Sequence, residues 1–305
     1  MRGARRVAFP LGTGLVGAGV LVALLLIARL LWPPHLLAKD QAEPSYECES
    51  EPIGGYQACV FTDANGQTMN FLLNVPAGYD SHKKYPLVLL LHGGGERGHR
   101  EFSVGSNLAV LTRLNYVSVW APHKEHASVQ SRWPSFVVVP QLMGRERWVD
   151  ISPRHGSYRL SPEPTLELKT ARDIVDYLRR EYPGIDGRRV YLTGISLGGY
   201  GSWDALERWP KYFTAALIAS GAGDPSNAAV LKDIPIWVLH GADDPIVPVS
   251  GSVDMFHAIK ALGGSKVQFT EVPYAGHDIW GIVYNITSPT HNHVKWLFSQ
   301  RKGGP

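Results

Sequence analysis

The stretch VYLTGISLGGYG, Val190–Gly201, contains the clearest local signal for the fold of this chain. An apolar run leads into Ser196, which is flanked by Gly194 and Gly198. Glycines at these two positions remove side chains that would collide where the chain turns sharply from a strand into a helix. The stretch therefore predicts a strand, a tight turn that presents the Ser196 hydroxyl, and a helix that begins directly after it.

Buried strands and amphipathic helices alternate on both sides of this turn. Continuous apolar runs predict strands that are buried on both faces, and a helical periodicity of apolar residues separates them. The expected strands are LVLLLH (87–92), FVVVP (136–140), VYLTG (190–194), ALIAS (216–220), IPIWVLH (234–240) and VQFTEV (267–272), and the expected helices cover 165–182, 253–264 and 293–302. This alternation predicts an α/β fold with a mostly parallel sheet and helices on both faces.

Two local features precede these strands. Asn65-Gly66 lies between two β-rich runs in CVFTDANGQTMNFLLNV (59–75), and this dipeptide is a strong signal for a β-hairpin. Cys48 and Cys59, the only cysteines, are eleven residues apart. In an oxidising compartment a disulfide between them would contribute about 3 kcal/mol to stability. We expect this disulfide rather than two unrelated thiols.

The N-terminus has a different composition from the rest of the chain. Three arginines, Arg2, Arg5 and Arg6, precede an uncharged stretch of 22 residues, 7–28. A helix of this length spans the hydrocarbon core of a membrane, and the cleavage patterns that follow it are weak. We therefore expect a transmembrane anchor over 1–32, a linker over 33–45 and a catalytic domain over 46–305, held outside the cytoplasm. Signal cleavage and secretion is the alternative.

The overall composition excludes several classes of partner. The 305 residues are 44% hydrophobic and 19% charged, which suits one large α/β domain, and the net charge is +3 without a long basic run. We expect no nucleic-acid partner. Two cysteines without suitably spaced histidines do not form a zinc site, so we expect neither a metal nor a cofactor.

The candidate catalytic residues each follow a predicted strand. Ser196 follows VYLTGI, the pair Asp243 and Asp244 follows IPIWVLHGA, His277 follows VQFTEVPYAG, and the run HGGGERG (92–98) follows LVLLL. Parallel strands end at one edge of a sheet, where the sites of such folds form. The residues are therefore expected to meet there, in the chain order Ser, Asp, His that α/β-hydrolases use.

These residue types have complementary chemical roles. A neutral serine is a weak nucleophile, so Ser196 needs a base, and His277 is placed to take its proton. A buried carboxylate must hold that histidine and stabilise its protonated form. The oxyanion of the tetrahedral intermediate needs fixed N–H donors, which we expect from Leu197, at a helix N-terminus, and from Gly94 and Gly95.

With these motifs in place, the chain from about Tyr56 to Lys302 resembles the α/β-hydrolase superfamily, in particular bacterial carboxylesterases of the phospholipase/carboxylesterase and feruloyl-esterase-like group. The resemblance is carried by LLLHGGGERG, FVVVPQ, VYLTGISLGGYGSWDAL, IPIWVLHGADDPIVPV and VPYAGHDIW. It implies Ser196 as nucleophile, His277 as base and Asp244, the aspartate of an H-G-x-x-D pattern, as acid. HGGG stands where relatives often have HGAG.

Physical reasoning also favours Asp244 over its neighbour Asp243. Asp244 precedes Pro245, which biases it towards an extended backbone and restricts the loop. Asp243 would then face solvent or cap a turn. Trp280 and, in the irregular segment 123–164, Trp148 are candidates for substrate contacts, although Trp280 could instead pack beneath the histidine loop.

The leading functional hypothesis is a carboxylic-ester hydrolase that acts on a small-molecule ester through an acyl-enzyme. Two alternatives stay open. A serine peptidase of the prolyl-oligopeptidase type uses the same triad, but only about 55 residues precede LVLLLHG after the apolar stretch, too few for a β-propeller. A non-catalytic binding domain on a hydrolase scaffold has no need of all three residues. The aromatic and basic residues of 123–159 would permit an aromatic ester such as a feruloyl ester.

Overall fold

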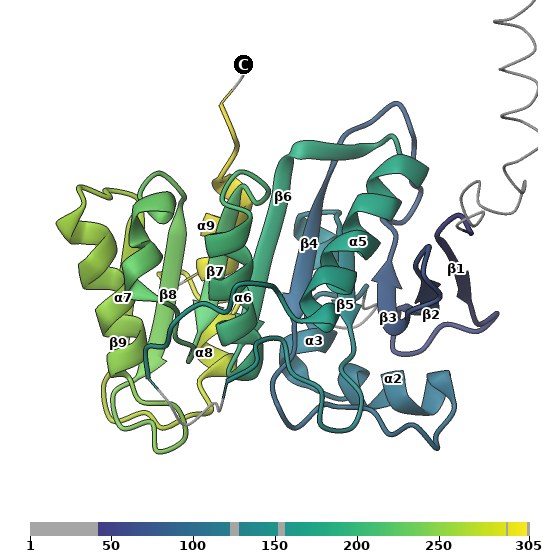
Figure 1. The fold of residues 1–305 in the computed structure, drawn as a ribbon. Helices are drawn as coiled ribbons and strands as arrows, with labels where there is room; N and C mark the ends of the chain where they lie inside the picture. Colours follow the sequence, from purple (N-terminus) through teal and green to yellow (C-terminus); the bar gives the residue numbers. More distant parts are fainter. Residues whose placement is uncertain (1–41, 123–127, 152–155, 291, 304–305) are drawn as a thin grey trace, which may run out of the picture. The chain divides into compact units, whose positions relative to one another are not determined.

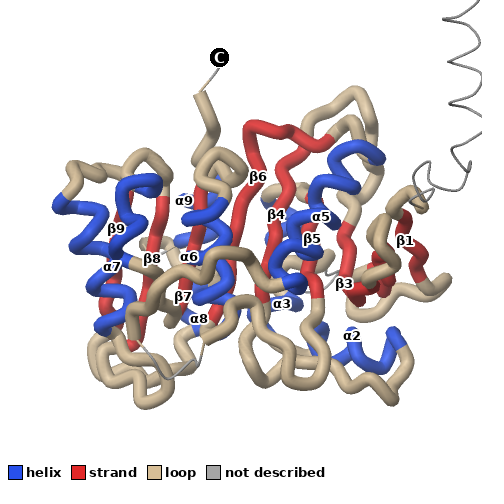
Figure 2. Tube along the Cα trace, in the orientation of Figure 1, coloured by secondary structure: helices blue, strands red, loops and turns tan. Residues whose placement is uncertain are grey.

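A single sheet organises the chain (Figures 1 and 2). The computed structural model of the protein describes residues 42–122, 128–151, 156–290 and 292–303, and within them the sheet has nine strands in the order β1-β2-β3-β5-β4-β6-β7-β8-β9. The strands are β1 (Ser45–Cys48), β2 (Gln57–Thr62), β3 (Thr68–Asn74), β4 (Tyr85–Leu91), β5 (Phe136–Pro140), β6 (Ile185–Ile195), β7 (Ala215–Ala219), β8 (Ile236–Gly241) and β9 (Val267–Val272).

The sheet changes character along its width. Strands β1, β2, β3 and β5 pair antiparallel, whereas β5, β4, β6, β7, β8 and β9 pair parallel. The predicted hairpin joins β2 to β3, where Thr62 pairs with Thr68. Its turn contains Gly66 at φ +83°, a left-handed conformation that glycine adopts without steric cost. The prediction of a mostly parallel sheet is confirmed.

Helices cover both faces of the sheet. They are α2 (Val104–Thr112), α3 (Asn115–Ser118), α4 (Val129–Arg132), α5 (Leu166–Glu181), α6 (Leu197–Arg208), the 3₁₀ helix η2 (Pro225–Leu231), α7 (Ser250–Ala261), α8 (Trp280–Val283) and α9 (His293–Ser299). Helices α5, α6 and α7 lie on the near face in Figure 1, and with η2 they share one apolar cluster. Helices α2, α3, α4, α8 and α9 contribute to the second cluster, on the other face.

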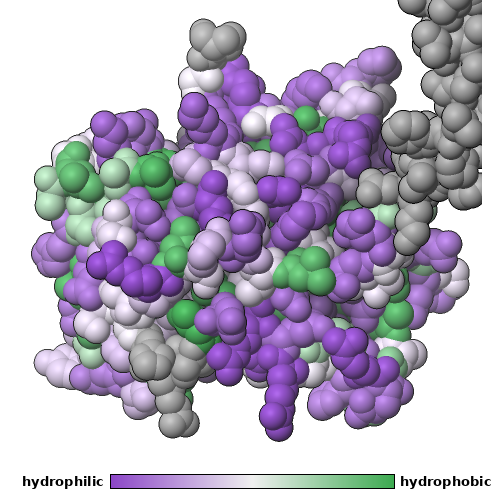
Figure 3. Space-filling model, viewed as in Figure 1, coloured by the Kyte–Doolittle hydropathy of each residue, from purple (hydrophilic) through white to green (hydrophobic). Residues whose placement is uncertain are grey.

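The parallel strands are apolar on both sides because helices cover both of their faces. Every residue of β4 after Tyr85 is buried, and all five residues of β5 and of β7 are buried. Helix α5 shows the complementary pattern, with Leu168, Ala171 and Leu178 among its buried residues. The face of the molecule seen in Figure 3 is mainly hydrophilic, as the amphipathic pattern of the helices predicts.

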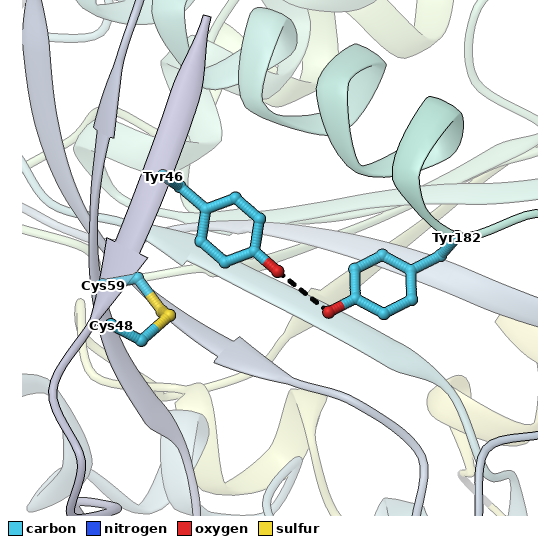
Figure 4. The surroundings of a disulfide bond; sticks show 4 residues. All are labelled: Tyr46, Cys48, Cys59 and Tyr182. Atoms are coloured by element: carbon cyan, nitrogen blue, oxygen red, sulfur yellow. Dashed lines mark hydrogen bonds between the residues drawn. A yellow bond between two sulfur atoms is a disulfide. The ribbon is translucent and has the colours of Figure 1, made fainter.

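The first strand is fixed by a covalent bond and by an aromatic contact (Figure 4). Cys48 on β1 pairs directly with Cys59 on β2, and the two form a disulfide. Tyr46 reaches the end of α5, where its hydroxyl lies 2.8 Å from that of Tyr182. Tyr46 and Cys48 are two residues apart, so both contacts are made from the same face of the edge strand.

The predicted fold class is corrected in one respect. No helix among the described residues is long and apolar enough to cross a membrane, so the transmembrane helix that was expected as part of the fold is not found in this part of the chain. The apolar stretch 7–28 lies outside the described residues. The limits expected for the segments 1–32, 33–45 and 46–305 stay predictions.

Candidate active site

Ser196 lies at the turn between β6 and α6. Its backbone has φ 51° and ψ −117°, a strained conformation for a residue with a side chain. The turn is possible because the backbones approach so closely: a Cβ added to Gly194 would lie 2.2 Å from the carbonyl oxygen of Gly198, and one added to Gly198 would lie 1.9 Å from that of Leu91. No side chain fits at either position, and this is why glycines flank the serine.

Three predicted residues meet at the carboxyl edge of the sheet. The Nε2 atom of His277 lies 2.9 Å from Ser196 Oγ, and its Nδ1 atom lies 2.7 Å from Asp244 Oδ2. A carboxylate only accepts hydrogen bonds, so Nδ1 carries the proton and Nε2 is free to accept the serine proton. The His277 ring is partly exposed, with 20% of its side-chain surface accessible, whereas the Asp244 side chain is fully buried.

Asp244 is held in its charged form by several donors. Burial alone would raise its pKa, but hydrogen bonds from His240, from His277 and from the backbone N–H groups of Val247 and Ile246 hold the pKa of this carboxyl well below its usual range. The two backbone groups donate to Oδ1 at 2.9 and 2.8 Å.

Asp243 lies differently from its neighbour. Its residue is exposed, and its backbone N–H donates to the carbonyl of Ala275. The geometry therefore brings Asp244, and not Asp243, to the histidine.

The glycine run after β4 is fixed by two side chains. The backbone N–H of Leu142 donates to His92 Nε2, so the proton of this ring is on Nδ1, 2.6 Å from the carbonyl oxygen of Gly93. Arg97 donates from Nη1 to the carbonyl of Gly94 at 2.7 Å. In a trans peptide the N–H points away from the preceding carbonyl, so these contacts turn the N–H groups of Gly94 and Gly95 to the opposite side.

This loop lies against the serine turn. A Cβ added to Gly93 would lie 3.6 Å from Ser196 Cβ. Leu197 is the first residue of α6, so its N–H has no partner within the helix and is directed, with the helix dipole, out of the N-terminus. The donors expected from Gly94, Gly95 and Leu197 thus come from two segments that flank one hydroxyl.

The two predicted tryptophans have different surroundings. Trp148 is fully buried, donates from Nε1 to the carbonyl of His92 at 3.0 Å and packs against Gly201. It supports the glycine loop from behind and has no exposed ring surface to offer a substrate. Trp280 is half-buried, and its ring centre lies 5.3 Å from that of His277. It also lines a cavity of about 260 Å³ beside Tyr116.

The sequence of residues 77–286 matches the phospholipase/carboxylesterase family. The chain belongs to this family. The resemblance drawn from its motifs is therefore confirmed. Among the described residues, no group of three or more His, Cys, Asp or Glu side chains is placed to hold a metal ion.

Individual relatives of this phospholipase/carboxylesterase chain are distant. It is 28% identical over 108 residues to a bifunctional acetylxylan esterase/xylanase from Neocallimastix patriciarum. That aligned region covers 35% of this chain and 16% of the esterase/xylanase. It is 26% identical to acyl-protein thioesterase 1 from Neurospora crassa, over 62% of this chain and 79% of that one. A solved thermostable esterase shares 32% identity with a TM-score of 0.64, covering 82% of this chain and 64% of that structure. The chain thus spans less than two thirds of two of these proteins.

Sequence reasoning missed one residue that contacts this site. His240, at the end of β8, is fully buried with Nε2 3.2 Å from Asp244 Oδ2. It is the histidine from which the H-G-x-x-D pattern is counted, and that pattern was the signal available in the sequence.

Proposed function

We propose that this chain is a serine hydrolase that cleaves carboxylic esters through an acyl-enzyme. The observation that carries the proposal is the continuous chain of hydrogen-bond distances from Ser196 through His277 to Asp244. Membership of the phospholipase/carboxylesterase family supports the same reaction type.

In the proposed acylation step, Ser196 Oγ bonds to the ester carbonyl carbon while its proton moves to His277 Nε2. The carbonyl electron pair moves to oxygen, where N–H groups of Leu197 and of Gly94 or Gly95 stabilise the negative charge. The carbonyl then re-forms, the bond to the alcohol oxygen breaks, and His277 gives its proton to that oxygen. Asp244 stabilises the transient imidazolium without taking the proton itself.

Deacylation repeats this sequence with water. His277 Nε2 accepts a proton from a water molecule as its oxygen attacks the acyl carbon. The second tetrahedral intermediate collapses, the bond to Ser196 Oγ breaks, and the proton returns to the serine. The carboxylic acid leaves and the resting state is restored.

A small-molecule ester is the substrate class that we propose. The half-buried Trp280 beside His277 offers an aromatic surface for the acyl or alcohol group. An aromatic ester such as a feruloyl ester is consistent with this surface.

A labelling experiment tests the nucleophile. Wild-type protein should react covalently with a fluorophosphonate probe, and Ser196→Ala should abolish both the label and ester turnover, by about 10⁴-fold or more. Ser299→Ala, which changes an exposed serine on α9, is the matched control and should keep both. Labelling that survives in Ser196→Ala would show that the nucleophile is elsewhere.

A substrate panel separates the reaction classes. We expect turnover of p-nitrophenyl acetate and butyrate and of methyl ferulate, and little turnover of peptide p-nitroanilides. Preferential cleavage of the anilides would instead support a serine peptidase. Absence of both labelling and turnover would support a binding domain.

We further propose that the chain matures in an oxidising compartment outside the cytoplasm. The disulfide between Cys48 and Cys59 supports this, because such bonds persist where thiols are not kept reduced. Alkylation and mass spectrometry of protein taken from its native host should find both thiols blocked. Free thiols in that protein would contradict the assignment.

A further inference from the structure

Arg97 contacts the glycine loop, and the proposed mechanism gives it no role. Its guanidinium donates from Nη1 to the carbonyl oxygen of Gly94 at 2.7 Å and from Nε to that of Glu146 at 2.7 Å. Both acceptors are backbone oxygens, one in the glycine loop and one in the turn that follows β5. The side chain therefore joins the loop to a segment 49 residues further along the chain.

The positive charge of Arg97 has no carboxylate partner. Among the described residues, no carboxylate oxygen lies within ion-pair distance of its guanidinium, and the nearby Glu146 side chain pairs instead with the exposed Arg100 at 2.6 Å. Burial and the charge of Arg147 lower the pKa of Arg97, but a guanidinium stays protonated near neutral pH. The charge therefore acts on the backbone of the loop rather than on a carboxylate.

The carbonyl that Arg97 holds belongs to the peptide whose N–H is that of Gly95. In a trans peptide this N–H points away from the carbonyl, and so away from Arg97. Gly95 is exposed, a Cβ added to it would meet no atom within 4 Å, and its N–H has no acceptor among the described residues. The Gly95 N–H is thus a free donor on an open side of the loop, and Arg97 fixes its direction.

The preceding peptide of the loop is held by different means. Its carbonyl, that of Gly93, lies 2.6 Å from Nδ1 of His92, a ring with no exposed surface that also accepts from the N–H of Leu142. The Gly94 N–H is therefore positioned by a residue of the core, whereas its neighbour depends on one long side chain. Removing Arg97 should release one donor of the loop and leave the other in place.

We propose that Arg97 is a positioning residue for the oxyanion site, which directs the Gly95 N–H to the oxyanion and strengthens it as a donor. This inference deepens the proposed ester hydrolase function and rests on it. A cation bound to a peptide oxygen draws electron density from the peptide nitrogen, and hydrogen bonds in such a chain strengthen one another. The same charge attracts the negative charge that develops on the other side of the peptide.

Kinetics test this role against a merely structural one. Arg97→Met keeps a long side chain but removes its charge and donors. The Gly95 donor is then misaligned rather than lost, so we expect kcat for a p-nitrophenyl ester to fall about 10–100-fold with KM unchanged. Arg97→Lys keeps the charge with a single point donor and should lose less than about 10-fold. Arg100→Met removes an exposed arginine that binds the Glu146 side chain and, as the matched control, should leave kcat unchanged.

A transition-state analogue shows whether the lost rate comes from the oxyanion. With phenyl trifluoromethyl ketone, Ser196 Oγ bonds to the carbonyl carbon, its proton moves to His277, and the ketone oxygen takes the negative charge. The affinity of Arg97→Met for this ketone should fall by the same factor as kcat/KM. If Arg97→Met does not fold, Arg97→Lys carries the same comparison.

Chemical rescue tests the charge itself. Guanidinium ion, at concentrations too low to unfold the protein, should restore part of the kcat that Arg97→Ala loses and should not accelerate wild type. A raised KM at constant kcat in Arg97→Met would overturn the proposal and place the guanidinium in contact with substrate. An unchanged kcat would show that the loop keeps its shape without Arg97.

A measurement on the free protein separates this inference from the function on which it rests. In protein labelled with ¹⁵N-glycine, the amide signal of Gly95 is identified by its loss in Gly95→Ala. We expect that signal to shift in Arg97→Met and not in Arg100→Met, and an unmoved signal would overturn the positioning role. A shifted signal in a protein that neither hydrolyses esters nor reacts with the fluorophosphonate would refute the ester hydrolase function and leave the loop contact established.

Discussion

The serine turn and the segment 156–165, here called the strap, are both irregular connections, but they are held by different means. The serine turn is fixed by backbone close to it in space, through Gly194, Gly198 and the carbonyl of Leu91. The strap crosses α6 and is fixed by polar contacts. Its Tyr158 N–H donates to the carbonyl of Gly223, and its Leu160 N–H donates to a carboxylate oxygen of Asp224.

Buried charges beneath the strap complete its attachment. Arg208 of α6 forms an ion pair with Asp204 and donates to the carbonyl oxygens of Ser161 and Pro162. The Asp204 and Arg208 side chains are only 2% and 9% exposed. Glu207 accepts from the backbone N–H of Asp224, and burial raises the pKa of Glu207 to about 9.

This difference sets how each region responds to change. The serine turn has no room for added side-chain atoms, so it is sensitive to the volume of the residues that form it. Its proposed chemistry depends on where the turn holds the Ser196 hydroxyl. The strap depends on buried titratable side chains, so it is sensitive to pH and to the geometry of a few donors.

At the catalytic edge, one of two adjacent aspartates should be indispensable. Asp244→Asn leaves a neutral amide against His277 Nδ1, and we expect kcat for a p-nitrophenyl ester to fall about 10⁴-fold near neutral pH. Asp243→Asn is the matched control, because that residue is exposed and outside the triad, and it should stay within a few-fold. The reverse result would mean that the loop is assigned out of register by one residue.

In the serine turn, one added methyl group should disrupt the fold. Gly198→Ala would place its Cβ 1.9 Å from a backbone oxygen of β4, and we expect a loss of about 4 kcal/mol or more in the free energy of unfolding, measured in urea. Gly281→Ala on α8 meets no atom within 4 Å and is the matched control. Equal stability of the two variants would show that the close approach does not constrain the turn.

Beneath the strap, Glu207 should make stability fall as the pH rises. Its pKa is about 9 in the folded protein and near 4.5 when unfolded, so the folded state holds an extra proton between these values. We expect the free energy of unfolding to decrease by about 4 kcal/mol from pH 5 to pH 8 through this group. Glu207→Gln should remove that part of the slope.

Glu101→Gln, at an exposed position, is the control for the Glu207 measurement and should keep the wild-type slope. A slope that is the same in Glu207→Gln and wild type would show that the Glu207 carboxyl is ionised in the fold.

The smallest effect is expected from the donor geometry of Arg208. Arg208→Lys keeps a positive charge beside Asp204 but loses the fork that reaches the carbonyls of Ser161 and Pro162, so we expect a loss of about 1 kcal/mol in urea unfolding. Arg208→Ala leaves the buried Asp204 unpaired and should cost about 3 kcal/mol. Ester turnover should fall less in either variant than in Asp244→Asn. A larger loss of turnover would place the strap within the catalytic machinery.

Local sequence patterns predicted the parallel strands of the sheet, the hairpin before them and the chain order of the candidate catalytic residues. Strands such as β4 and β7 are apolar throughout, and a chain can satisfy that composition only where helices cover both faces of a sheet. Because parallel strands end at one edge, Ser196, Asp244 and His277 could be expected to meet before any distance was known. Their signals are local: a glycine pair, a proline and a strand end.

Contacts between distant segments could be found only in the folded structure. The sequence suggested Trp148 as a substrate contact, yet this residue is buried behind the glycine loop. Its indole nitrogen lies 3.0 Å from the carbonyl oxygen of His92, a contact between segments far apart in the sequence. His240 likewise contacts Ser252, whose hydroxyl lies 2.9 Å from the carbonyl oxygen of Gly221, and these residues belong to different elements. Hydrogen bonds of this kind act over about 3 Å between residues far apart in sequence, so no local pattern specifies them.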